Sequence, residues 1–133
     1  MRSDNGSRRA HTVWASFRYA GQGLHAAWRE QRNFRIHTVL TAAVVVLGAL
    51  CRLDPARWAL LIFAAGLVLA AELANTALEA LVDLVSPEDH PLAGRAKDVA
   101  AAGVLIAAVA AALIGLLVFV PVLAARAAGG AMI

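Results

Sequence analysis

The chain has 133 residues and a mass of 13.9 kDa, a length that suits one domain. Hydrophobic residues make up 61% and charged residues 16%, with a mean hydropathy of +0.70, whereas soluble domains have about 45–50% and about 25%. This composition excludes a soluble globule, because the surplus apolar surface must face lipid or other subunits. The single cysteine, Cys51, cannot form an internal disulfide.

The basic residues are concentrated before the first long apolar run. The net charge is +3, and seven of the twelve Lys and Arg residues precede Ile36. A basic flank beside an apolar span is typical of a cytoplasmic segment near anionic lipid. We therefore expect no nucleic-acid partner, and we expect residues 1–11 to be a disordered basic N-terminus.

Residues 12–32 carry a helical apolar pattern. Apolar positions at steps of three and four are Trp14, Phe17, Gly21, Leu24 and Trp28. Polar positions on the opposite side are Arg18, Gln22, His25 and Arg29. The pattern predicts an amphipathic helix in the membrane interface. A helix that packs only against protein would show the same stripe.

Three apolar runs predict transmembrane helices at residues 33–51, 58–82 and 97–121. The first spans only if Arg35 and His37 snorkel to the headgroups. A signal peptide is the competing interpretation of this run, but no A-x-A-like cleavage site follows it. The chain is thus expected to be an all-α, multi-pass membrane protein with one domain at residues 12–122.

The connections between the runs set the expected orientation. Asp54-Pro55 indicates a short outer turn, residues 86–94 an inner loop in which Ser86 could cap a new turn, and residues 123–133 a frayed tail. With the N-terminus cytoplasmic, the inner segments hold nine basic residues and the outer segments three. This bias predicts that orientation in the inner (plasma) membrane.

Four polar residues share one face of the second span. Steps of three, four and four align Glu72, Asn75, Glu79 and Asp83. Glu72 is expected roughly 7–8 Å inside the inner interface. A carboxylate in hydrocarbon costs about 2.5–3.5 kcal/mol on insertion scales, so the face argues for function. The alternative is a purely structural role, with interhelical hydrogen bonds from Glu72 and Asn75.

A second polar cluster, Gly94-Arg95-Ala96-Lys97-Asp98, begins the third span. Lys97 is the only lysine in the chain, and a compact ammonium suits a phosphate oxygen. Carboxylates beside an ammonium suggest Mg²⁺ and a nucleotide, with Glu79 as a metal ligand and Glu72 as the base for an acceptor hydroxyl. In the third span, Gly103, Ala107, Ala111 and Gly115 form a small-residue stripe that favours close helix packing.

Together these residues resemble the prokaryotic diacylglycerol kinase and undecaprenol kinase family. The resemblance rests on Glu72-Leu-Ala-Asn75-Thr-Ala-Leu-Glu79-Ala-Leu-Val-Asp83, His90 and Gly94-Arg95-Ala96-Lys97-Asp98. Phe17-Arg-Tyr19-Ala-Gly-Gln-Gly23-Leu and Asn33-Phe34-Arg35-Ile36-His37 are similar to it too. The resemblance implies a homotrimer with active sites shared between subunits, in which MgATP phosphorylates a membrane lipid alcohol.

The resemblance also implies roles for individual residues. Glu72 matches the catalytic base, Asn75 its neighbour, and Glu79 a metal ligand. The positions that match nucleotide and phosphate contacts are Tyr19, Asp83, His90, Gly94, Lys97 and Asp98.

One position departs from the family pattern. The second metal-binding Glu stands three residues before the Phe matched by Phe34, where this chain has Gln31, with Glu30 one residue earlier. A one-residue offset turns a helical side chain by about 100°. Either Glu30 reaches the metal through an altered helix, or the carbonyl oxygen of Gln31 takes its place.

The Asn33–His37 stretch resembles the undecaprenol-phosphorylating branch more than the diacylglycerol branch. We therefore expect undecaprenol as the acceptor, with diacylglycerol as the alternative. Two other functions stay open from the residues alone: a proton-coupled transporter using Glu72, and a structural membrane subunit that needs only the Gly103 stripe. The transporter would not need the cytosolic acids and Lys97 together.

Overall fold

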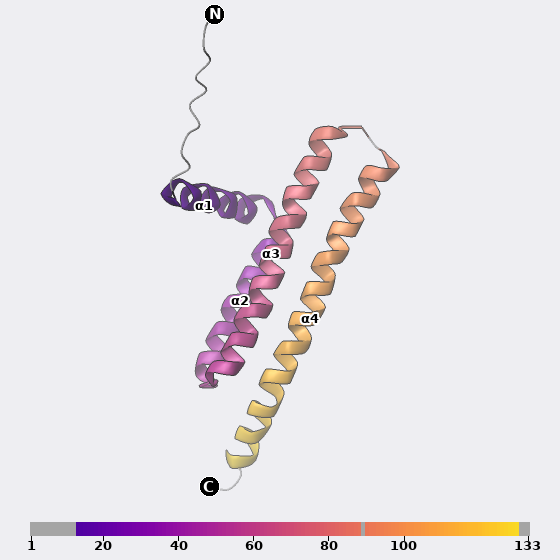
Figure 1. Cartoon of the computed structure of the whole chain (residues 1–133). Coiled ribbons are helices and arrows are strands. Elements are labelled where there is room, and N and C mark those ends of the chain that lie inside the picture. The colour runs from indigo at the N-terminus through magenta and orange to yellow at the C-terminus, as the bar shows by residue number, and fades with distance from the viewer. Residues whose placement is uncertain (1–12, 89, 131–133) are drawn as a thin grey trace, which may run out of the picture.

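The computed structural model describes residues 13–88 and 90–130, which form four helices and no strand (Figure 1). They are α1 (Val13–Glu30), α2 (Arg32–Leu50), α3 (Pro55–Val85) and α4 (Pro91–Gly130). The last three are long and apolar enough to cross a membrane, which confirms the expected all-α membrane fold. The expected disordered N-terminus, residues 1–11, lies outside the described residues.

Figure 1 shows α1 lying across the direction of the other three helices. The bend is made by one residue, Gln31, whose backbone is extended (φ −103°, ψ 112°). The guanidinium of Arg35 reaches back and donates to the carbonyls of Trp28 and Arg29, at 3.3 and 3.1 Å. Carbonyls at a helix end lack intrahelical donors. Arg35 therefore caps the end of α1.

The turn between α2 and α3 is a Schellman motif. The backbone N–H of Leu53 donates to Gly48 at 3.3 Å, and that of Arg52 donates to Ala49 at 3.0 Å. Arg52 has φ of +49°, at the position where such a motif usually has glycine. The Leu53 side chain is buried against the helices, so both backbone hydrogen bonds and side-chain packing stabilise the turn.

Asp54 begins α3. Its carboxylate accepts hydrogen bonds from the backbone N–H groups of Ala56 and Arg57, at 3.0 and 3.1 Å, and Pro55 occupies the first helical position. The bond from the Arg57 backbone, together with the charge of the Arg57 guanidinium, holds the pKa of Asp54 below its ordinary value despite some desolvation.

A cluster of buried apolar residues lies at this end of the bundle, which we call the turn end. Its buried members are Cys51, Leu53, Leu61, Val118 and Phe119. Gly48 lets α2 approach α3, because a Cβ there would stand 3.0 Å from the ring of Trp58. Many large apolar side chains along the helices are exposed, including Ile106 and Leu117 at 71% and 77%. The apolar surplus therefore faces outward, as the composition requires.

α4 is longer than the expected third span at both ends. It starts at Pro91 and continues through Pro121 to Gly130, so the prediction of a frayed tail from residue 123 is wrong over the described part. Proline removes one helical hydrogen bond, but neighbouring structure can satisfy the freed group in a membrane helix. At 1.5 Å per residue the helix is about 60 Å long, well beyond the hydrocarbon thickness.

Ser86 and the small-residue stripe of α4 were both expected to have local structural roles. Ser86 stands at the end of α3: its N–H donates to the carbonyl of Val82 at 2.9 Å, and its hydroxyl donates to the carbonyl of Glu88 at 3.2 Å. In the small-residue stripe of α4, Ala107 is buried, whereas Gly103 is exposed with no atom near the position of a Cβ. The stripe is thus only partly covered within one chain.

Candidate functional site

The polar face predicted on α3 is present as a gradient of burial. Glu72 is 3% exposed, Asn75 and Glu79 are half-buried, and Asp83 is exposed. Nδ2 of Asn75 donates to Oε1 of Glu79 at 2.8 Å, one helical turn further on. The face therefore runs from the interior of the chain towards the end that carries the α3–α4 loop, which we call the loop end.

Glu72 is the buried end of this face. Nε2 of His37, on α2, lies 3.2 Å from Oε1 of Glu72, yet this oxygen has no hydrogen bond with any described residue. The two groups are thus at ion-pair distance without hydrogen-bond alignment. Oδ1 of Asn75 is also buried without a donor. Buried acceptors are costly when unpaired, and they indicate where a donor group of a ligand would bind.

At the loop end, Lys97 of α4 forms an ion pair with Asp83 of α3. Between these helices lies an open cavity of about 440 Å³, and its lining includes Asp83, His90, Gly94 and Lys97. Four positions expected to contact a nucleotide therefore share one cavity. Asp98 is exposed and does not belong to this lining.

His90 and Gly94 also have local roles in starting α4. Nδ1 of His90 accepts a hydrogen bond from the N–H of Leu92 at 3.2 Å, which caps the helix. The N–H of Gly94 donates to the carbonyl of His90 at 3.1 Å, and the space where a Cβ would stand is open. The cavity therefore keeps an unobstructed backbone wall at Gly94.

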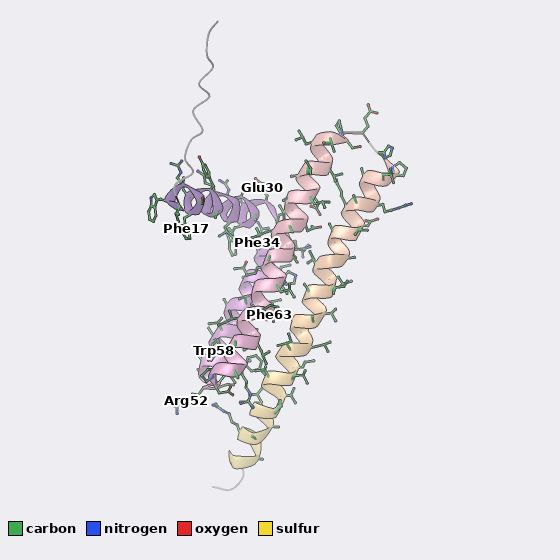
Figure 2. All side chains as sticks on the ribbon, viewed as in Figure 1. Phe17, Glu30, Phe34, Arg52, Trp58 and Phe63 are labelled. Atoms are coloured by element: carbon green, nitrogen blue, oxygen red, sulfur yellow. The ribbon has the colours of Figure 1, made fainter. Side chains whose placement is uncertain are left out.

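The expected site residues of α1 lie apart from this cavity. Glu30 lines a different cavity of about 660 Å³ on α1, together with Arg18, His25 and Arg29. Figure 2 shows Glu30 near the end of α1 that joins α2, with Arg52 and Trp58 at the turn end. Tyr19 is exposed, and its ring lies 5.3 Å from the guanidinium carbon of Arg18. Within one chain, neither Tyr19 nor Glu30 lines the α3–α4 cavity.

The described residues of one chain contain no group of three or more His, Cys, Asp or Glu side chains that could hold a metal ion. Glu79 still fits a magnesium ligand: it is half-buried, and the hydrogen bond from Asn75 engages only one of its oxygens. Mg²⁺ typically binds one or two protein carboxylates, with waters and substrate phosphates at the other positions. Gln31, half-buried at the α1–α2 bend, brings no charge.

His37 was not among the residues predicted to form the site. It stands at the start of α2 in a run that is otherwise apolar from Ile36 apart from two threonines. An imidazole in such an apolar run is a signal of a functional residue. Only the packing of α2 on α3 reveals that Glu72 is its partner.

Comparison with known proteins gives a consistent result. The profile of a family described as prokaryotic diacylglycerol kinase matches residues 18–119. Undecaprenol kinase of Bacillus subtilis (strain 168) is 38% identical over 121 residues, which cover 91% of this chain and 98% of that protein. Diacylglycerol kinase of Synechocystis sp. is 47% identical over 107 residues, covering 80% and 61%. Diacylglycerol kinase of Escherichia coli (strain K12) is 41% identical over 93 residues, covering 70% and 76%.

Proposed function

The chain belongs to the prokaryotic diacylglycerol kinase family, and we propose that its acceptor is undecaprenol. Members of this family are ATP-dependent lipid kinases, and this chain has helices long and apolar enough to span a membrane. The relative matched over 98% of its length is named undecaprenol kinase. The Asn33–His37 stretch supports the same branch. Other relatives are named diacylglycerol kinase, so diacylglycerol is the alternative acceptor.

The observation that carries the catalytic proposal is the buried Glu72 carboxylate, whose Oε1 has no hydrogen-bond partner among the described residues. This oxygen accepts the proton of the lipid hydroxyl. The hydroxyl oxygen forms a bond to the γ-phosphorus of ATP, and the bond from that phosphorus to the bridging oxygen breaks, so ADP leaves. A general base must lie within hydrogen-bond reach of the proton it takes, so in this proposal the lipid hydroxyl binds beside Oε1 of Glu72.

The positions of the polar residues along α3 support a specific order of the bound substrates along this helix. From Glu72 to Asp83 the helix rises about 16 Å. The lipid hydroxyl binds at Glu72, the phosphates next to Asn75 and Glu79, and the nucleoside towards Asp83 and the α3–α4 cavity. Lys97, already in an ion pair, brings positive charge to the phosphates at this end.

Mg²⁺ is the proposed cofactor, with Glu79 as its first ligand and Glu30 as the second, or the Gln31 carbonyl oxygen in its place. When bound, the ion supplies charge neutralisation between phosphate oxygens, on which phosphoryl transfer depends. The residues of this chain position the substrates and take up the proton.

A homotrimer with shared sites is proposed as the working assembly. Tyr19 and Glu30 do not line the α3–α4 cavity of their own chain, which supports a site that α1 of a neighbouring subunit completes. The large apolar side chains exposed on the helices would be partly covered by such contacts. The tests are cross-linking and mass measurement in detergent, in which a monomer alone would contradict this assembly.

The proposed location is the inner (plasma) membrane, with the N-terminus cytoplasmic. α1 and the α3–α4 loop lie towards one end of the bundle and the turn end lies at the other (Figure 1). The concentration of basic residues before Ile36 supports a cytoplasmic position for the loop end and its cavity, on the side where ATP is available. Protease accessibility of residues before Val13 in sealed inner-membrane vesicles tests the orientation.

The experiment for the activity is phosphorylation of defined lipids. Membranes with the protein receive γ-labelled ATP, Mg²⁺ and either undecaprenol or diacylglycerol. We expect label in undecaprenol, its loss in Glu72→Gln and a strong reduction in Lys97→Ala. Asp54→Asn, an acid at the opposite end of α3, is the matched control and should retain activity. No label in either lipid would overturn the kinase activity, and label in diacylglycerol alone would reassign the acceptor.

A further inference from the structure

The contact between His37 and Glu72 has no role in the chemistry described so far. We propose that His37 is a positioning residue, which holds the Glu72 carboxylate in the orientation in which it accepts the proton of the lipid hydroxyl. The proposal rests on the proposed function, because it concerns the side chain assigned there as the base.

The geometry singles out His37. Among the described residues, Nε2 of His37 is the side-chain nitrogen placed at ion-pair distance, 3.2 Å, from the Glu72 carboxylate. The nearest polar neighbours on α3 have other partners: Thr76 donates to the backbone carbonyl of Glu72, and Nδ2 of Asn75 donates to Glu79. The orientation of the carboxylate in one chain therefore depends on α2 and not on its own helix.

The surroundings make this contact important. The Glu72 side chain is 4% exposed and that of His37 is 24% exposed. His37 is the one titratable residue in the lining of an apolar groove of about 420 Å³, which continues between α2, α3 and α4 past Leu40, Val44 and Phe119. Water that could replace the imidazole as a donor is poorly accommodated in such an apolar lining. A carboxylate without a fixed donor would rotate, and errors of about 1 Å in a catalytic group can cost about 100-fold in rate.

One carboxylate oxygen can serve both groups. A carboxylate oxygen accepts two hydrogen bonds, so Oε1 has a lone pair for His37 and a second for the lipid hydroxyl. Catalytic hydrogen bonds are often long or poorly aligned without substrate and tighten when it binds. The 3.2 Å separation without alignment is consistent with a contact that becomes a full hydrogen bond in the complex with substrate.

Two isosteric substitutions test the proposal. In His37→Gln the side-chain amide nitrogen occupies the place of Nε2, whereas in His37→Asn the amide is shorter and cannot reach Glu72. Full-length protein in membranes is assayed for kcat and for the KM of ATP and lipid. We expect His37→Asn to lower kcat by about 10- to 100-fold with both KM values unchanged, and His37→Gln to restore most of the activity. Thr41→Val, one turn along α2 in the same groove, is the control and should match the unaltered protein.

Each other result overturns the proposal. Activity of His37→Asn equal to that of the unaltered protein would show that Glu72 needs no such partner. Equal loss in both variants would show that a hydrogen-bond donor at Nε2 is not what matters. A rise in KM with a lower unfolding temperature would assign His37 to packing alone. If the unaltered protein labels no lipid, the kinase function itself is refuted. If labelling is lost in Glu72→Gln but kept in His37→Asn, the kinase function stands and only the role of His37 is refuted.

Discussion

Arg126 donates a 2.7 Å hydrogen bond from Nη2 to the backbone carbonyl of Cys51, 75 residues earlier in the chain. A second bond, of 3.1 Å, joins its Nη1 to the carbonyl of Leu50. Both carbonyls stand at the end of α2, where intrahelical donors are lacking. The last turns of α4 are therefore part of the structure at the turn end.

The first prediction concerns this contact. Arg126→Ala should lower the free energy of unfolding by about 1–2 kcal/mol, because two carbonyls lose charged donors at a partly exposed site. Arg126→Lys should recover part of this loss, since an ammonium can reach one carbonyl but lacks the planar fork. The measurement is reversible unfolding in mixed micelles with increasing sodium dodecyl sulfate. Equal stability of Arg126→Ala and the unaltered protein would show that the contact contributes nothing.

Arg52 gives a prediction of the opposite sign. Its φ of +49° is unfavourable for a residue with a Cβ, by roughly 1 kcal/mol relative to glycine. Arg52→Gly should therefore raise the free energy of unfolding by about that amount, whereas Arg52→Ala, which keeps a Cβ, should not. The same unfolding assay compares the two variants. A less stable Arg52→Gly would mean that the side chain makes contributions that exceed the backbone strain.

The third prediction is a dependence of stability on pH at Asp54. Because its pKa is lower in the folded chain than in the unfolded chain, folding is favoured by the charged form. This stabilisation is fully present above the ordinary carboxylate pKa, and it is lost as the pH falls through the lower value of the folded state. Asp54→Asn keeps a side chain that can cap the helix but does not titrate. Its free energy of unfolding should therefore change less than that of the unaltered protein between about pH 6 and strongly acidic pH, because one titrating group is lost. An identical pH profile in both proteins would contradict the prediction.

The second magnesium ligand can be identified by titration with the ion. If Glu30 is the ligand, Glu30→Gln should raise the Mg²⁺ concentration for half-maximal lipid phosphorylation by about 10-fold, equivalent to about 1.4 kcal/mol. Gln31→Ala should leave it unchanged. The reverse pattern would assign the position to the Gln31 carbonyl oxygen. The two residues are adjacent but differ in charge, so one assay separates them.

Features determined by spacing along one helix could be predicted from the sequence. The shared face of Glu72, Asn75 and Glu79 follows from helical periodicity, and the Asn75–Glu79 hydrogen bond is a contact one turn apart. The membrane-spanning helices follow from runs of apolar residues. These features need no knowledge of how one helix packs on another.

Features determined by packing between helices could not be predicted in this way. The His37–Glu72 contact depends on the register of α2 against α3, which the Schellman turn and the Gly48–Trp58 approach determine. α4 continues beyond Pro121, although proline usually indicates an end, and Arg126 in this continuation contacts carbonyls at the end of α2.

A single extended residue, Gln31, connects α1 to α2. Because α1 and α2 are both helical up to Gln31, the connection contains no loop that could absorb a change in its length. We therefore expect that a residue inserted beside Gln31 would change the direction of α1 relative to α2, and with it the direction in which the polar side of α1 points.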